Sequence, residues 1–259
     1  MERAKIIADL HTHTVKSPLG QSTLSENISA AKLRGIEILA VTEYGPQYNN
    51  NNFKKEIFKI KEYIPRKIGE IRLLFGVECN VMDVYSARLD LDLEEVLDLD
   101  IVIASYHPKS ELDNDIVTDL KITEMLCTLA NNPSVMIIGH PDRYLVGFDI
   151  EKVLNICKSN QKIIELNNLK LGEPRNRELM KEILIKCKEM KIPICVTSDA
   201  HIANQVGDFS EAISLLDETE FPDDLIINND EEKLEQYIRD YKKLRQIAVD
   251  RKKTRKMYI

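Results

Sequence analysis

Seven short apolar segments recur along the chain, and stretches with helical spacing separate them. The segments are rich in Ile, Val and Leu and do not alternate cleanly with polar residues, which is typical of parallel strands covered on both faces. The stretches between them carry apolar residues three or four positions apart, which predicts amphipathic helices. The predicted strands are residues 5–10, 36–42, 73–77, 101–105, 135–139, 162–166 and 194–197, and the predicted helices include residues 24–34, 118–130, 150–159 and 176–190.

Regular alternation of strand and helix predicts a parallel sheet, and seven units favour a closed or nearly closed β/α barrel. The alternative fold is a doubly wound open sheet. A length of 259 residues suits one barrel domain, and 43% hydrophobic residues allow a sizeable core. We predict a single barrel domain over residues 1–229 and a C-terminal helix with a basic tail over residues 230–259. Residues 47–52 are predicted to form an asparagine-rich loop, and residues 82–92 an insertion after the third strand.

The formal net charge of -7 argues against nucleic acid or an anionic membrane as the main partner. Residues 242–259 are mostly basic, and a solvated helix end is favoured over a nucleic-acid site. No apolar stretch approaches the roughly 20 residues that span a bilayer, and the N-terminal segment lacks the apolar stretch of a signal peptide. The five cysteines are far apart and include no Cys-x-x-Cys pair, which is typical of reduced thiols. We expect a cytoplasmic protein without a membrane partner and leave its oligomeric state open.

All five histidines follow predicted strands. The carboxyl ends of the strands in a parallel barrel form the face where ligands bind, because the loops there meet over the barrel mouth. A lone histidine is more often a core or surface residue than a ligand, but five on one face favour a shared site. They are His11 and His13 after the first strand, His107 after the fourth, His140 after the fifth and His201 after the seventh.

The spacing of these residues supplies further geometry. His11 and His13 lie two apart on extended chain, so both imidazoles point to the same side and can converge on one metal. Asp199 and His201 repeat this arrangement after the last strand, which neighbours the first if the barrel closes. Glu78 follows the third strand, where the two oxygens of a carboxylate can bridge two cations. A bridge indicates a multinuclear site.

Imidazole nitrogens mixed with carboxylate oxygens, without thiolates, suit zinc, manganese or iron. Two cations about 3.5 to 4 Å apart can turn a bridging water into hydroxide and stabilise the oxygens of an in-line displacement at phosphorus. That chemistry needs few protein bases. The sequence contains no Gly-x-Ser-x-Gly elbow, no Walker-type phosphate loop and no Gly-x-Gly-x-x-Gly turn, so serine hydrolase, kinase and dinucleotide-binding functions are not supported.

Six short motifs, taken in order, resemble the PHP (polymerase and histidinol phosphatase) superfamily, and most closely its YcdX-like phosphatase branch. The resemblance runs from about residue 5 to residue 229. It implies a distorted seven-stranded β/α barrel with up to three metal ions and phosphoesterase activity. The motifs are Asp9-Leu10-His11-Thr12-His13, Gly76-Val77-Glu78, Ser105-Tyr106-His107, Gly139-His140-Pro141, Glu165-Leu166-Asn167-Asn168 and Ser198-Asp199-Ala200-His201.

By matched position, the resemblance implies two complete metal sites that share one carboxylate. Zinc is the expected metal, with manganese or iron as alternatives. The first metal would be held by His11, His13, Glu78 and Asp199, and the second by Glu78, His107 and His140.

The third metal site of the family is incomplete in this chain. The second strand ends with Glu43 and Tyr44 where the family has Asp and His, and Leu19 replaces another expected histidine. Leucine cannot ligate, and a phenol ligates only when ionised, with an ordinary pKa of about 10. We therefore expect two tightly bound metals and at most a weak third site near His201, completed by Glu43 or Tyr44. His201 would then be free to bind substrate phosphate or to protonate a leaving group.

Polar residues at other strand ends are candidates for substrate binding. Arg143 follows a metal ligand and would grip phosphate, with a surface salt bridge to Asp142 or Asp149 as the alternative. Asn167 and Tyr44 would line the barrel mouth. Asn168 shares that position or caps a loop, and Arg175 and Arg177 are second-tier phosphate candidates.

Three functions are compatible with these residues. The first is a dinuclear phosphomonoesterase that acts on a small phosphorylated metabolite through a metal-bridging hydroxide. The second, motivated by Leu19 and Tyr44, is a metal-binding relative with reduced catalysis and a regulatory or assembly role. The third is metal-dependent hydrolysis of C–N bonds, since amidohydrolase barrels also open with His-x-His. Those barrels typically use a bridging lysine where this chain has Glu78, which disfavours the third function.

Overall fold

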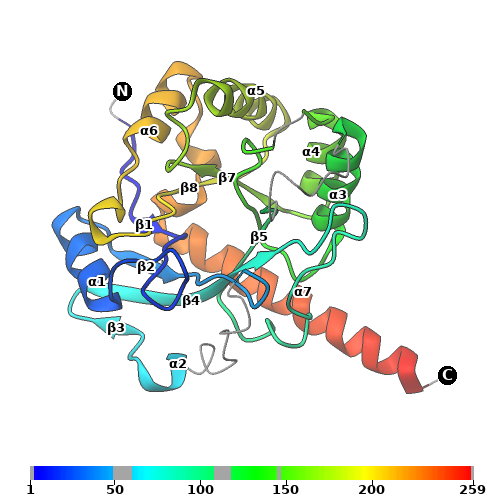
Figure 1. The fold of residues 1–259 in the computed structure, drawn as a ribbon, viewed down its shortest axis with the longest axis horizontal. Helices are drawn as coiled ribbons and strands as arrows, with labels where there is room; N and C mark the ends of the chain where they lie inside the picture. Colours follow the sequence, from blue (N-terminus) through cyan, green and yellow to red (C-terminus); the bar gives the residue numbers. More distant parts are fainter. Residues whose placement is uncertain (1–2, 49–59, 108–117, 145–146, 258–259) are drawn as a thin grey trace.

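The predicted barrel is confirmed by the computed structural model, which describes residues 3–48, 60–107, 118–144 and 147–257 (Figure 1). Seven parallel strands form a nearly closed barrel, and helices surround it. Neighbouring strands follow chain order throughout, which excludes the doubly wound sheet because its strand order reverses at a switch point. The strands are β1 (Ala8–Asp9), β2 (Ile38–Val41), β4 (Ile71–Asn80), β5 (Ile101–Ser105), β6 (Ile137–Ile138), β7 (Ile163–Asn167) and β8 (Ile194–Thr197).

Strand boundaries differ from the prediction where pairing is unusually short or long. β1 and β6 are only two residues each, because β1 pairs with β2 at two positions and β6 pairs with β5 and β7 at two positions each. β4 extends three residues past the predicted end at Val77, because its pairing with β5 continues to Asn80 opposite Ser105. An additional strand, β3 (Lys67–Ile68), pairs antiparallel with the start of β4. Two exposed residues carry no apolar pattern, so the sequence did not indicate β3.

The four predicted helices are confirmed, and their ends carry recognisable signals. Thr23 and Glu26 form a capping box that satisfies backbone N–H groups at the start of α1. Pro174 stands in the first turn of α5, where its missing N–H is not needed. The helices are α1 (Leu24–Leu33), α2 (Ile60–Tyr63), α3 (Asp119–Asn131), α4 (Ile150–Ser159), α5 (Pro174–Met190), α6 (Ser210–Glu218) and α7 (Glu231–Met257), with 3-10 turns η2 (Ala203–Gln205), η3 (Asp223–Leu225) and η4 (Ile227–Asn229).

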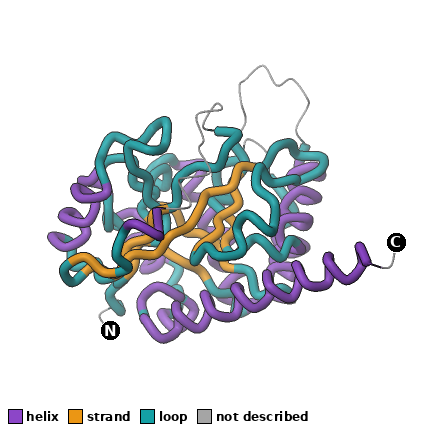
Figure 2. Tube along the Cα trace, turned by 90° about the horizontal axis from the view of Figure 1, so that it is seen from below, coloured by secondary structure: helices purple, strands orange, loops and turns teal. Residues whose placement is uncertain are grey.

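Alternate side chains of each strand enter different parts of the core. Leu73 and Phe75 of β4 belong to the layer that packs beneath the outer helices. Leu74, between them, belongs to a second cluster inside the barrel, which also contains Ile238 and Tyr241 of α7. Helix α7 therefore closes the end of the barrel opposite the ligand-binding face, and its last turns extend past the barrel (Figures 1 and 2). The division between residues 229 and 230 stays a prediction.

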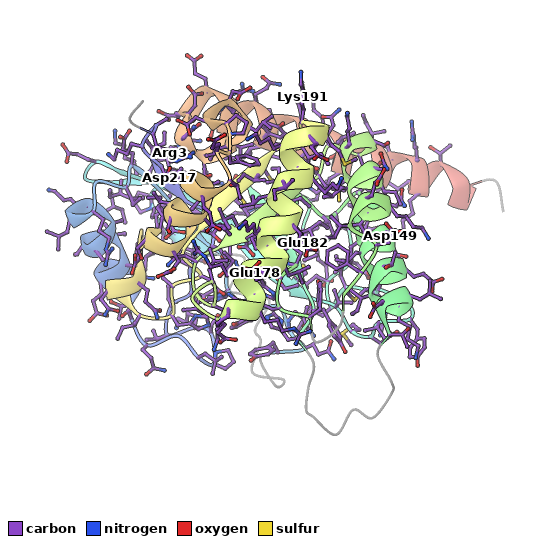
Figure 3. All side chains as sticks on the ribbon, turned by 90° about the horizontal axis from the view of Figure 1, so that it is seen from above. Arg3, Asp149, Glu178, Glu182, Lys191 and Asp217 are labelled. Atoms are coloured by element: carbon purple, nitrogen blue, oxygen red, sulfur yellow. The ribbon has the colours of Figure 1, made fainter. Side chains whose placement is uncertain are left out.

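The segment before β1 is fixed to the outside of the barrel. Arg3 pairs with Asp217 at 2.8 Å and with Asp223 at 2.6 Å, and Figure 3 shows Arg3 beside Asp217 of α6. The predicted insertion at residues 82–92 is an irregular loop, and its Leu89 bridges back to Val81, the residue before that loop. The predicted loop at 47–52 lies outside the described residues from residue 49 onward. Within the described part of the chain, no helix is both long and apolar enough to cross a bilayer.

Asn228 completes the barrel between β1 and β8, which in the described part of the chain are linked by one β-bridge, from Thr12 to Ala200, beyond the ends of the two strands. The Asn228 amide donates to the carbonyls of Ala8 and Val196, both at 2.7 Å, and its oxygen accepts from the Val196 N–H at 3.0 Å. The side chain thus replaces the peptide groups that a continuous ladder would provide. Because Asn228 is fully buried, no solvent replaces those partners.

Replacing Asn228 with alanine is expected to lower the free energy of unfolding by about 3 kcal/mol, because buried backbone groups lose their partners. Urea unfolding monitored by circular dichroism measures this change. Asn229→Ala is the matched control, since its side chain is only part-buried and bonds at the surface, donating to the Asp223 carbonyl and accepting from Lys233 Nζ. Equal losses in the two variants would contradict the closing role of Asn228.

Candidate metal centre

The six predicted metal ligands converge at the carboxyl ends of the barrel strands. They form two groups in which the donor atoms lie within 4.8 Å of one another. All six are buried except His107, which is partly exposed. The first group contains His11, His13 and Asp199, which follow β1 and β8, and the second contains Glu78 in β4, His107 after β5 and His140 after β6.

Glu78 lies between the two groups and presents one carboxylate oxygen to each. Its Oε2 lies 3.2 Å from His11 Nε2 and 3.4 Å from His13 Nε2. Its Oε1 lies 3.1 Å from His140 Nε2 and 3.5 Å from His107 Nε2. This arrangement supports the bridging position predicted for Glu78.

Two carboxylate oxygens in this centre lack hydrogen-bond donors. Glu78 Oε2 and Asp199 Oδ1 are buried and accept no hydrogen bond from any residue that the structure describes. Burying a carboxylate oxygen without a donor or a cation is energetically unfavourable. Divalent cations would satisfy both oxygens, and a mixed set of imidazole nitrogens and carboxylate oxygens suits zinc, manganese or iron. The residues present therefore fit the metals that the sequence implied.

Two of the converging residues have unusual backbone conformations. His140 has a φ of 23° and Asp199 has a φ of 53°. His140 follows β6 and Asp199 follows β8, both at the barrel mouth. Non-glycine residues rarely adopt positive φ, and such residues cluster at functional sites, where surrounding structure holds them. Here the positive φ at His140 and Asp199 turns the chain so that both side chains reach the candidate metal centre.

Glu165 belongs to one of the six motifs, but the sequence predicted no role for it in the site. It is fully buried in β7, and its Oε1 lies 2.6 Å from His11 Nδ1 and accepts from the Thr197 hydroxyl at 2.7 Å. Its Oε2 accepts from the His140 backbone N–H at 2.6 Å. A carboxylate that accepts from Nδ1 orients the ring and leaves Nε2 for a metal. The sequence signal that could have indicated Glu165 is an acidic residue inside an otherwise apolar predicted strand.

Arg143 and Asn167 reach the centre, but both are bound to Asp199. Arg143 Nη1 donates to Asp199 Oδ2 at 3.0 Å, and Asn167 Nδ2 donates to the same oxygen at 3.1 Å. A further hydrogen bond joins the guanidinium of Arg143 to Asn167 Oδ1. The alternative surface salt bridge was wrong, because Asp142 is buried and Asp149 caps α4. With Oδ2 fixed in this way, Asp199 Oδ1 faces the first histidine pair.

The second-tier candidates are held elsewhere. Arg177 pairs with Glu218 of α6 at 2.9 Å, so its prediction as a phosphate ligand was wrong. Arg175 donates to the Tyr144 carbonyl at 2.9 Å. The Asn168 side chain accepts from a backbone N–H of α6 at 2.9 Å, which agrees with the capping alternative.

Tyr44 and His201 form a hydrogen-bonded pair beside the first group, so His201 is not free as predicted. His201 Nδ1 lies 2.8 Å from the Asp199 carbonyl, which can only accept, so Nδ1 carries the proton. His201 Nε2 is then the acceptor for the Tyr44 hydroxyl at 3.0 Å. Tyr44 also stacks on His13 with centroids 4.3 Å apart. Burial and the carboxylates of Glu78 and Asp199 raise the pKa of Tyr44, so the phenol stays neutral.

Glu43 was the other residue expected to complete a weak third site, and Leu19 stands where the family has a histidine. Glu43 accepts from the Thr14 backbone N–H at 3.1 Å and from the hydroxyls of Thr14 and Ser17. Leu19 is 50% exposed. The described donors therefore form the two groups above, and the number of bound metals stays a prediction.

Protonation in this centre opposes metal binding at the first group. Burial alone would lower the pKa of His13, but contacts with Asp199 and Glu78 outweigh it and raise the pKa to about 9. Burial lowers the pKa of His107 to about 4, so that ring is neutral at neutral pH. Burial also raises the pKa of Glu78, but His11 and His107 hold it well below its usual range.

Zinc binding to the metal-free protein is expected to release at least one proton at neutral pH, because His13 must lose its proton to ligate. The affinity of the first group should fall at least tenfold for each pH unit below the His13 pKa, where protons compete with the metal. Calorimetric titration in buffers of different ionisation enthalpy counts the protons. Binding without proton release would contradict this protonation state.

Comparison with known proteins gives consistent results. A family model for the PHP domain matches residues 9–172. A probable phosphatase of Caldanaerobacter subterraneus subsp. tengcongensis is 36% identical over 244 residues, covering 93% of this chain and 94% of that protein. A probable phosphatase of Clostridium novyi is 35% identical over 248 residues, covering 95% and 100%.

A solved structure shares the fold. The crystal structure of histidinol phosphate phosphatase from Lactococcus lactis subsp. lactis, in complex with zinc, L-histidinol and phosphate, superposes with a TM-score of 0.62. It is 18% identical and covers 84% of this chain and 95% of its own. At that identity the likeness establishes the barrel architecture.

Proposed function

Because this chain belongs to the PHP domain family, we propose that it is a metal-dependent phosphoesterase that hydrolyses a small phosphorylated metabolite. The observation that carries the proposal is Glu78, with one oxygen facing each of two ligand groups. The probable phosphatases that match nearly the whole chain support phosphoester hydrolysis.

We assign two divalent metals to this centre, with zinc as the first candidate and manganese or iron as alternatives. When bound, the metals supply a nucleophile formed from water at neutral pH and positive charge against the phosphoryl oxygens. The first would be held by His11, His13, Glu78 and Asp199, and the second by Glu78, His107 and His140.

The residues around the metals orient ligands and substrate in this proposal. Arg143 and Asn167 fix Asp199 so that one oxygen remains available. Arg143 Nε has no hydrogen-bond partner within the described structure, so we assign this guanidinium to substrate phosphate as well. Tyr44 and His201 lie beside the first group, and we assign the protonated form of His201, in which Nε2 also carries a proton, to proton delivery to the leaving group.

Replacing His201 with alanine is expected to lower kcat about 100-fold for an alkyl phosphate, whose leaving oxygen needs a proton. The loss should be under about tenfold for p-nitrophenyl phosphate, whose leaving group needs no protonation. Steady-state assays with both substrates test this difference. Tyr44→Phe is the control that keeps the stacked ring and removes only the hydroxyl. Equal losses for both substrates would exclude His201 as the proton donor.

Metal analysis of the purified protein followed by a phosphoester panel on the same sample tests the proposed function. Metal-dependent turnover that a chelator abolishes supports it, whereas an unchanged rate in metal-free protein contradicts it. Loaded protein that hydrolyses no phosphoester would instead support the regulatory or assembly role. Glu78 at the bridge disfavours C–N bond hydrolysis, and an amide panel tests that alternative.

A further inference from the structure

One residue outside the ligand set determines which nitrogen of His107 can bind a metal. Asn80 Oδ1 lies 3.0 Å from His107 Nδ1, and Asn80 Nδ2 donates to Gln47 Oε1 at 3.0 Å. The amide group of Asn80 is thus committed to Gln47, which leaves its carbonyl oxygen toward His107. A carbonyl only accepts, so His107 Nδ1 carries the proton and Nε2 keeps its lone pair.

Asn80 is itself held in place by the strand and by the neighbouring loop. It is 2% exposed, ends β4, and pairs in register with Ser105 of β5, two residues before His107. Its backbone N–H donates to Asp90 Oδ1 at 3.0 Å, and its carbonyl accepts from the Asp90 N–H at 3.1 Å. Asn80 therefore has little freedom to turn away from His107.

Asp90 connects the insertion of residues 82–92 to the loop after β2. Its Oδ2 accepts from the Gln47 backbone N–H at 3.0 Å, which fixes the residue that orients the Asn80 amide. Gly45 permits this approach, because a Cβ there would lie 2.4 Å from Asp90 Oδ2. One carboxylate from the insertion thus fixes both partners of the His107 contact.

We propose that Asn80 is a positioning residue for the second metal, and that Gln47 and Asp90 hold it in the orientation that leaves His107 Nε2 for that metal. The inference rests on the proposed metal centre but not on phosphoester hydrolysis. The first group should be independent of this network, because Glu165 of β7 orients His11 and Ser17 lies 3.2 Å from His13 Nδ1. The contacts of Asp90 also give the insertion of residues 82–92 a role in metal binding that its sequence does not reveal.

Histidine ring NMR on the metal-free protein tests the orientation directly. The wild type should show His107 as a neutral ring protonated at Nδ1. Asn80→Leu should abolish that preference, and Asn80→Asp should restore it because a carboxylate oxygen accepts from Nδ1. A wild-type tautomer in Asn80→Leu would overturn the proposal.

Zinc titration with metal counting provides the second readout. Asn80→Leu should weaken the second metal about 10- to 100-fold and leave the first unchanged, while Asn80→Asp should retain both. Asp90→Ala should also weaken zinc binding at the second site. This variant tests the proposal if Asn80→Leu fails to fold. Asp83→Ala is the matched control, because Asp83 in the same insertion contacts Tyr85 and Ser86 instead.

The outcomes separate this proposal from the proposed function. Unchanged binding of both metals in Asn80→Leu, or equal weakening of both, would overturn the positioning role. A wild-type protein that holds two metals without hydrolysing phosphoesters would overturn the function alone.

Discussion

Replacing Glu78 with alanine is expected to reduce phosphoester hydrolysis about 10³- to 10⁴-fold, the loss of several kcal/mol of transition-state stabilisation. The reason is geometric, because one side chain faces both ligand groups through different oxygens. Removing it takes one ligand from each proposed metal at once. Initial rates with excess zinc or manganese, together with metal content per chain, measure the effect.

The controls for this variant separate catalysis from folding. Glu182→Ala changes an exposed carboxylate on the outer helix α5, visible in Figure 3, and should leave the rate unchanged. Thermal melting of both variants shows whether the barrel remains folded. Wild-type activity in Glu78→Ala would exclude the bridged centre.

Replacing Arg245 with alanine is expected to lower the free energy of unfolding by about 3 to 5 kcal/mol. Arg245 of α7 is fully buried and donates to the carbonyls of Val96 and Leu99 at 2.6 and 2.7 Å. Truncation removes the guanidinium donor from both carbonyls, leaves the Val96 carbonyl with the Leu99 N–H as its donor, and opens a cavity beneath the barrel. Urea unfolding with a fitted midpoint and slope measures the change.

Arg251→Ala is the matched control, because it removes the same side chain from an exposed position of the same helix. Its loss should stay below about 0.5 kcal/mol, as for most surface substitutions. Comparable losses in the two variants would mean that α7 is not anchored through Arg245. The zinc content of folded Arg245→Ala should match the wild type, since this end of the barrel lies opposite the metal centre.

The barrel and its ligand-binding face were predictable because apolar periodicity records burial. The segments that became β5 and β8 were predicted to the residue, since both are fully buried and bounded by polar loops. β3 was not predictable, because its two exposed residues owe their conformation to pairing with β4. The short extent of β1 and β6 likewise depends on neighbouring strands.

The amino-acid sequence by itself determined which residues gather at the barrel mouth. Histidines at strand ends must converge once parallel strands close into a barrel, so a shared cluster followed from order and spacing, and the family resemblance divided it into two proposed metal sites. It did not determine their hydrogen-bond partners. Arg143 was expected to meet phosphate or a surface acid, yet it holds Asp199, and Tyr44 engages a His201 that was expected to be free.

Only the tertiary structure decided the supporting contacts of the centre. Glu165 orients His11 across 154 positions of sequence separation, and Asn80 meets His107 across 27. Periodicity reports which face of an element is buried, but it carries no information about the partner on another element. Hydrogen-bond partners are fixed by strand register and loop closure, which arise only when the whole barrel assembles. For this protein, the sequence determined the fold and the candidate ligands, and tertiary packing determined how each ligand is oriented.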